Sequence, residues 1–86
     1  MYHGLKMRKI YRFTASWCAP CKMLAKTLEG EDLGVDIEVI DIDENRELCE
    51  QFNIRGVPTL ADANSGKLLV GNSSLSDIQK WLKELL

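Results

Sequence analysis

The sequence lacks several features that would point to common classes of function. Its net charge of −2 at pH 7 gives no reason to expect nucleic acid or an anionic membrane as a partner. No apolar run approaches membrane-spanning length, and residues 1–6 lack the apolar core of a signal peptide. Three cysteines is an odd number, which argues against the disulfide framework of a small secreted protein. We therefore expect a cytoplasmic protein, in which a closely spaced cysteine pair serves catalysis or metal binding.

The length of 86 residues predicts a single domain over residues 1–86. Residue patterns predict strands at 9–15, 35–42, 56–60 and 67–70, and helices at 22–28, 44–52 and after residue 74. Asp43 and Ser74 are expected to cap the second and third helices. A helical crossover makes the first two strands parallel, and a tight turn at 64–66 makes the last two antiparallel. The sequence thus predicts an α/β fold with a mixed four-stranded sheet and helices on both faces.

Two cysteines separated by two residues lie at the junction of the first strand and helix, in the segment Trp17-Cys18-Ala19-Pro20-Cys21. The first sulfur then lies at a helix N-terminus, where unpaired N–H groups and the helix dipole favour an anion. The thiolate is the reactive form of cysteine. Pro20 falls in the first helical turn, where proline is tolerated. The pattern predicts that Cys18 attacks a disulfide and that Cys21, one turn along, resolves the mixed disulfide.

A metal half-site is the other interpretation of this spacing, and it needs two further ligands. Cys49 and His3 are the available candidates, and neither belongs to a paired motif. Cys49 falls on the predicted second helix near Leu48 and Phe52, where a lone cysteine is most often a small buried apolar residue rather than a regulatory thiol. The pattern therefore favours redox chemistry, with no metal expected.

Several segments together resemble the thioredoxin family over essentially the whole chain. They are residues 13–22 around the two cysteines, 41–43 at a strand end, 54–60 around Pro58, and 70–71 before the last helix. Ala19 stands where glycine is more usual. The resemblance implies a thioredoxin-like fold in a minimal β-α-β-α-β-β-α form, which lacks the extra N-terminal strand and helix of full-length thioredoxins. That outline is similar to glutaredoxins and to the short thioredoxin-like proteins of archaea and bacteriophages.

The resemblance also implies a substrate-binding groove around the cysteines. It makes Pro58 a cis-proline, which would turn the Val57 backbone outward beside Cys18 to pair with an extended substrate strand. Gly71 would leave room for substrate backbone. Trp17 would shield the disulfide and contact the substrate, the alternative being that its ring is simply packed. The expected substrate-binding residues are Trp17, Ala19, Pro20, Val57, Pro58, Thr59 and Gly71.

Arg12 departs from the family, because thioredoxins usually carry a buried aspartate there, beneath the disulfide. That aspartate is thought to help move a proton from the second cysteine, so its absence calls the usual proton route into question. A buried arginine needs a carboxylate partner or a route to solvent, and Asp41 on the neighbouring strand is one candidate partner. Near the sulfurs, Arg12 would favour thiolates. The alternative is an exposed side chain at a sheet end.

The leading functional interpretation is a thioredoxin-type protein-disulfide reductase. It needs no bound cofactor, because the transferred electrons reside on Cys18 and Cys21. By resemblance, a thioredoxin reductase-type enzyme recharges the pair, disulfide-containing proteins are the clients, and ribonucleotide reductase is one candidate client. We expect a monomer that takes part in cell redox homeostasis.

Two other interpretations remain open. A glutaredoxin-like protein recharged by glutathione fits the chain length, but segment 17–21 differs from the CPYC usual in glutaredoxins. Lys22 and Arg55 are the cations that could hold the carboxylates of glutathione. The third interpretation is a non-catalytic thioredoxin-like binding module, and the two intact cysteines argue against it.

Overall fold

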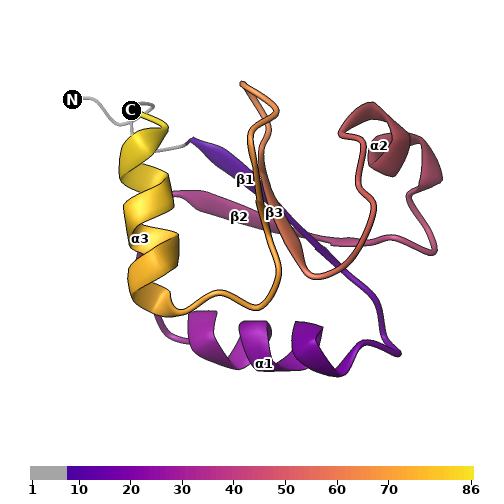
Figure 1. Ribbon diagram of the computed structural model, residues 1–86, viewed down its shortest axis with the longest axis horizontal. Helices are drawn as coiled ribbons and strands as arrows, with labels where there is room; N and C mark the ends of the chain where they lie inside the picture. The colour runs from indigo at the N-terminus through magenta and orange to yellow at the C-terminus, as the bar shows by residue number, and fades with distance from the viewer. Residues whose placement is uncertain (1–7) are drawn as a thin grey trace.

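The computed structural model describes residues 8–86, which form a four-stranded sheet covered by three helices (Figure 1). The strands are β1 (Lys9–Thr14), β2 (Asp36–Asp41), β3 (Thr59–Asp62) and β4 (Leu68–Val70), and the helices are α1 (Ala19–Leu28), α2 (Arg46–Gln51) and α3 (Leu75–Glu84). This is the element order that the sequence predicts. Within the described residues, none of the helices is both long and apolar enough to span a bilayer.

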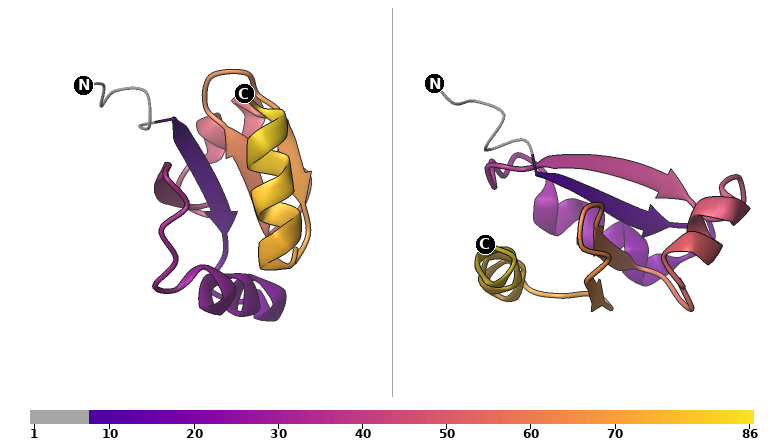
Figure 2. Two further views of the ribbon diagram at one scale, coloured as in Figure 1. Left: turned by 90° about the vertical axis from the view of Figure 1, so that its left-hand side faces the viewer. Right: turned by 90° about the horizontal axis from the view of Figure 1, so that it is seen from above.

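The sheet has the strand order β2-β1-β3-β4, so β1 is an internal strand. β1 pairs with β2 in parallel, with Arg12 opposite Val39, and with β3 in antiparallel fashion, with Arg12 opposite Leu60. β3 and β4 are antiparallel. These pairings confirm the predicted mixed sheet. Figure 2 shows β1 and β2 side by side, with the crossover helix α1 against them. The segment between β1 and α1, which carries the first cysteine, therefore lies at the carboxyl end of β1.

The sheet has an apolar layer on each face, because alternate residues of a strand point to opposite sides. One layer lies between the sheet, α1 and α3, and it contains Ile10, Leu24, Leu60, Ile78 and Trp81. The other layer lies under α2, and it contains Phe13, Ile40 and Ala61 with Leu48 and Phe52 packed against them. The predicted apolar stripe of α3, broadened by Trp81, is thus part of the core. Ile10 anchors the amino half of β1 in the first layer, and Phe13 anchors its carboxyl half in the second.

The second helix begins later than the sequence predicts. α2 starts at Arg46 rather than at residue 44, and its N-cap is Asn45, which makes no side-chain cap hydrogen bond. The prediction that Asp43 caps this helix is wrong, because the Asp43 carboxylate accepts a hydrogen bond from the indole of Trp17 instead. The Asp43 carboxylate, which the local sequence pattern predicts as a cap acceptor, thus accepts a hydrogen bond from a distant residue.

The third strand also begins later than predicted, at Thr59 rather than at residue 56. Pro58 has no N–H to donate to a sheet ladder, so regular pairing can begin only after it. By contrast, the predicted cap of α3 is confirmed: the Ser74 hydroxyl accepts a hydrogen bond from the Asp77 N–H at 3.1 Å. This cap depends only on residues three apart, which is why the sequence alone predicts it.

A buried carboxylate closes the end of the sheet opposite the cysteines. Asp62 is fully buried, and its Oδ2 accepts hydrogen bonds from the Arg8 guanidinium at 2.9 Å and from the hydroxyl and amide of Ser65 at 2.6 and 3.0 Å. Burial by itself raises the pKa of Asp62, but the bonds from Ser65 and Arg8 more than offset this effect. The pKa of Asp62 therefore lies below its usual value of 3.8.

We expect Asp62 to make the protein sensitive to acid. A carboxylate whose pKa is lower in the folded state stabilises the fold above its unfolded pKa, and this contribution is lost as the pH falls through the folded value. Asp62→Asn should therefore lower the free energy of unfolding at pH 7, and the difference from wild type should shrink below about pH 4. Urea unfolding between pH 2.5 and 7 measures this difference. Glu84→Gln removes an exposed carboxylate of α3 as a control, and an equal pH dependence in the two variants would contradict the assignment.

Candidate active site

Cys18 is the N-cap of α1, and the helix positions its sulfur. Its backbone is extended, and its Sγ accepts a hydrogen bond from the Cys21 N–H at 3.1 Å. This N–H is one of the amides that have no partner inside the helix at its first turn. The same amide and the positive end of the helix favour negative charge on sulfur once the disulfide opens. Pro20 lies in the first helical turn, as the sequence predicts, and α1 begins at Ala19, three residues before the predicted helix at 22–28.

Cys18 and Cys21 are joined as a disulfide whose Cα atoms lie 5.2 Å apart. Both residues are buried against Ala15, Ile42 and Val57, and Cys21 is the less exposed of the two, at 1% against 5%. An incoming sulfur therefore reaches Cys18 more easily than Cys21. The geometry separates an outer sulfur, at the end of the helix, from an inner sulfur that lies under it.

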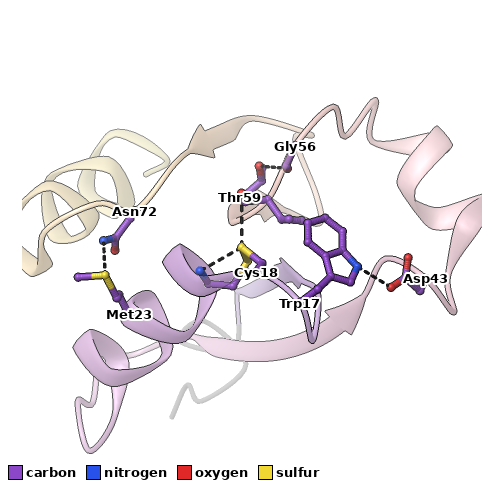
Figure 3. Close-up of a disulfide and its surroundings, with 9 residues drawn as sticks. Trp17, Cys18, Met23, Asp43, Gly56, Thr59 and Asn72 are labelled. Carbon is purple, nitrogen blue, oxygen red and sulfur yellow. Dashed lines mark hydrogen bonds between the residues drawn. A yellow bond between two sulfur atoms is a disulfide. The ribbon is translucent and has the colours of Figure 1, made fainter.

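The segment before β3 contacts the outer sulfur directly. The carbonyl oxygen of Val57 lies 3.8 Å from Cys18 Sγ, a contact drawn as a dashed line (Figure 3). The Val57–Pro58 peptide bond is cis. The Thr59 hydroxyl donates to the Gly56 carbonyl at 2.8 Å, which holds this turn in shape. Residues 39 positions apart in the sequence thus form one surface.

Gly71 lies next to this segment, at the end of β4. Its N–H donates to the Pro58 carbonyl at 2.8 Å, and its φ of +98° is one that residues with a side chain rarely adopt. A Cβ added to Gly71 would meet no atom within 4 Å, so the space beside it is open. The structure therefore brings Val57, Pro58, Thr59 and Gly71 to the same side of the molecule as the two cysteines.

Trp17 projects from the turn before α1 and is 67% exposed. Its indole N–H donates to Asp43 Oδ2 at 3.0 Å, and Figure 3 shows the ring extended toward Asp43, away from Met23 and Asn72. The ring is thus held in place by a hydrogen bond rather than by packing in the core. A large apolar surface is left open beside Cys18.

We expect Asp43→Ala to free the Trp17 ring. The exposed hydrogen bond contributes about 1 kcal/mol or less to stability, so the fold should survive its loss. In ¹H–¹⁵N spectra, the Nε1–H resonance of Trp17 should shift and exchange faster with water, whereas that of buried Trp81 should stay in place as an internal reference. Glu44→Ala removes the adjacent exposed carboxylate as a control, and an equal effect of the two substitutions would refute the role of Asp43.

Arg12 is half-buried on the face of the sheet that carries α1, and it does not pair with Asp41. Within residues 8–86 its guanidinium makes no hydrogen bond or ion pair. The Asp41 Oδ1 atom instead accepts a hydrogen bond from the Asp43 amide at 2.9 Å. The proposed Arg12–Asp41 partnership is therefore wrong, because their positions on β1 and β2 are out of register: Arg12 lies opposite Val39 and Asp41 opposite Thr14. Arg12 instead lines a groove with Ala25, Lys26 and Glu29, and burial lowers the pKa of its guanidinium.

Cys49 is a free, partly buried thiol packed in the layer under α2. Burial first, then the charges of Asp43 and Glu50, raise the pKa of Cys49, so this residue stays a neutral thiol at pH 7. Among the described residues there is no cluster of three or more histidine, cysteine, aspartate or glutamate side chains suited to a metal ion. The other candidate ligand, His3, lies outside the described residues.

Sequence reasoning missed two features of the site. The first is the hydrogen bond between Trp17 and Asp43, because the sequence pattern predicts Asp43 as a helix cap instead. The second is Arg46, which lies with Arg55 beside Trp17 in a groove next to the site. A lone carboxylate after a strand and a lone arginine on a short helix carry no spacing signal, so only the fold identifies them.

Comparison with known proteins agrees with this geometry. The family model named Thioredoxin matches residues 5–84, nearly the full chain. The chain belongs to the thioredoxin family. It is 36% identical over 61 residues to the thioredoxin of Bacillus subtilis, a match that covers 66% of this chain and 59% of that protein. With the thioredoxin of Alicyclobacillus acidocaldarius it shares 33% identity over 81 residues, which cover 86% of this chain and 77% of the relative.

Solved structures confirm the thioredoxin-like fold. A mutant thioredoxin from Halobacterium salinarum superposes with a TM-score of 0.78 at 31% identity, covering 88% of this chain and 72% of that one. The thioredoxin of Trypanosoma brucei brucei gives a TM-score of 0.76 at 28% identity, over 93% and 75% of the two chains. The chain nevertheless spans only 59% and 61% of the length of the thioredoxins of Bacillus subtilis and Staphylococcus haemolyticus.

Proposed function

We propose that the protein is a thiol–disulfide oxidoreductase that reduces disulfides of client proteins through Cys18 and Cys21. The observation that carries this proposal is the 3.1 Å hydrogen bond from the Cys21 amide to Cys18 Sγ, at the start of α1. This amide would stabilise a Cys18 thiolate in the reduced protein and a departing Cys18 thiolate when the disulfide is reopened. Membership of the thioredoxin family supports the same chemistry.

The reaction consists of two thiol–disulfide exchanges. The Cys18 thiolate attacks one sulfur of the client disulfide; a Cys18–client bond forms, the client S–S bond breaks, and the released client thiolate takes up a proton. The Cys21 thiol then loses its proton and attacks Cys18 Sγ. The Cys18–Cys21 bond forms, and the second client sulfur leaves as a thiolate and is protonated. Two electrons pass to the client, and the disulfide in the structure is the product form of the pair.

The proton of Cys21 needs an acceptor, and Arg12 cannot serve as one because its guanidinium stays protonated. No carboxylate in residues 8–86 hydrogen-bonds to Cys21. We therefore assign the proton of Cys21 to the departing client thiolate, directly or through water. Arg12 lines the groove beside Ala25, Lys26 and Glu29, so the scheme gives its charge no part in the exchange.

The client would bind as an extended strand across the cysteines. The backbone of Val57 beside Cys18 would pair with the client backbone, and the open space at Gly71 would admit it. Trp17, Ala19 and Pro20 would contact the client from the helix side, and Pro58 and Thr59 would hold the Val57 turn in place. A reducing cytoplasm suits this activity, because it keeps both the redox pair and the free thiol of Cys49 reduced.

The electron donor separates this proposal from a glutaredoxin-like function. We expect a thioredoxin reductase-type enzyme with NADPH to support the reduction of insulin, and glutathione with glutathione reductase to support it poorly. Measuring NADPH consumption with each system under matched conditions decides between them. Faster turnover with glutathione would establish the glutaredoxin-like alternative. No reduction of insulin even by the chemically reduced protein would instead support a binding module. We also propose that the protein acts as a monomer, and proteins such as ribonucleotide reductase can then be tested as its clients.

A further inference from the structure

A groove of about 580 Å³ continues from the active site toward α2. Trp17 and Val57 form its end next to the cysteines, and Val57 is the residue whose carbonyl oxygen lies 3.8 Å from Cys18 Sγ. Ile42 and Ile54 contribute apolar walls. In Figure 3 the ring of Trp17 points along this side of the molecule, toward Asp43. A client strand that lies beside Val57 with its cysteine at Cys18 therefore has its neighbouring residues over this groove.

Two exposed arginines, Arg46 and Arg55, line the groove. Neither side chain makes an ion pair or hydrogen bond within the described part of the chain. Arg46 also lies in the first turn of α2, where the helix dipole does not stabilise a cation. Glu50 is the acidic residue that lines the groove with them, and Asp43, bound to the indole of Trp17, lies just outside the lining. The lining itself thus carries two arginines and one carboxylate, on a protein whose own net charge is −2.

We propose that this groove selects client disulfides in which an acidic residue lies next to the reacting cysteine, an inference that rests on the oxidoreductase function proposed above. In an extended client, a side chain over the groove lies one or two positions along the chain from the cysteine at Cys18. A carboxylate there can accept paired hydrogen bonds from a guanidinium, which is a strong form of recognition. The apolar walls and Trp17 exclude part of the solvent around such a pair. Arg46 and Arg55 are thereby specificity-determining residues rather than catalytic ones.

The free thiol that also lines the groove does not compete with this role. Cys49 stays a neutral thiol at pH 7, as described above, and a neutral thiol is a poor nucleophile. An acidic client segment would therefore be bound in the groove while its disulfide reacts with Cys18 alone.

The proposal predicts that the protein prefers acidic peptides, whereas its net negative charge by itself would favour basic ones. The chemically reduced protein is mixed with disulfide-linked peptide dimers that are identical except for glutamate, glutamine or lysine on both sides of the cysteine. Each second-order rate constant is divided by that of dithiothreitol with the same peptide, which removes differences in intrinsic reactivity. At low salt, the wild type should favour the glutamate peptide over the glutamine peptide by about fivefold, as two partly exposed ion pairs allow. The repulsion expected from a net charge of −2 predicts the reverse.

Charge-removing variants locate the effect. Arg46→Gln with Arg55→Gln should abolish the preference for glutamate, and Glu50→Gln should increase it. Lys80→Gln removes an exposed cation of α3, far from the groove, and should leave the preference as in the wild type. All four positions are on the surface, so circular dichroism should show folded variants. If the preference is absent from the wild type, or persists in the double variant, the groove does not select acidic clients.

The reduction of insulin by the same preparations separates the two proposals. Wild-type protein that reduces insulin but treats the three peptides alike overturns the groove proposal and leaves the oxidoreductase function intact. Protein that reduces neither insulin nor any peptide overturns both. If free glutathione at millimolar concentration removes the glutamate preference, and the double variant no longer responds to it, the groove holds a small anionic thiol, and the assignment to protein clients is wrong.

Discussion

Replacing Cys18 by serine should reduce the rate of insulin reduction by at least about 10³-fold, because a hydroxyl cannot form the mixed disulfide of the proposed reaction. Cys18 is the more exposed cysteine of the pair, and its sulfur accepts a hydrogen bond from the Cys21 amide at the start of α1. The remaining thiol, Cys21, is 1% exposed and cannot reach a client disulfide in the folded protein. The fold should be retained, since serine is nearly isosteric and is itself a favourable N-cap. Turbidity of precipitating insulin chains measures the rate.

Cys21→Ser should behave differently, and this difference tests the order of attack. Cys18 can still open the client disulfide, but no second thiol resolves the product, so the Cys18–client disulfide should accumulate. Mass spectrometry of the trapped species, without reductant, would show the client attached through Cys18. Cys49→Ser removes the third thiol and should retain the reduction of insulin. Appreciable activity of Cys18→Ser, or trapping through Cys21 in wild type, would overturn the assignment of Cys18 as the nucleophile.

Replacing Phe13 by alanine should have the largest effect on stability. Phe13 is fully buried in the layer under α2, and its ring centroid lies 6.1 Å from the rings of both Tyr11 and Phe52. Loss of a buried phenylalanine costs about 3–5 kcal/mol. A domain of this length is expected to have a total stability of only about 4–13 kcal/mol. Urea unfolding should therefore show a variant that has lost a large part of its stability.

Two further variants test whether the cause is the buried cavity. Phe13→Leu refills much of the volume and should lose about 1–2 kcal/mol. Val39→Ala truncates a β-branched side chain on β2 that is 54% exposed, and should lose about 1 kcal/mol or less. Losses of similar size in Phe13→Ala and Val39→Ala would contradict the central position of Phe13 in this layer.

Much of the fold is predictable from the sequence because it depends on residues close together along the chain. The apolar spacing of α3, its cap at Ser74, and the β-branched run of β2 each act within a few residues, and all are found near their predicted positions. The errors occur where a distant segment intervenes. Asp43 does not cap α2, because its carboxylate accepts a hydrogen bond from Trp17, which lies 26 residues earlier. Arg12 has no partner in Asp41 because the register between β1 and β2 separates them.

The candidate site likewise has features that local sequence predicts and features that depend on the whole fold. Local spacing and helix signals are enough to predict two cysteines at a strand-to-helix junction, and the motif resemblance indicates which later segments belong with them. The surroundings of Cys18 emerge only in the folded chain: the Val57 carbonyl, the Trp17 ring held by Asp43, and the groove with Arg46 and Arg55. These neighbours come together through the packing of α2 and β3 against β1. Such proximity follows from the free energy of the whole fold, and no pattern of nearby residues encodes it.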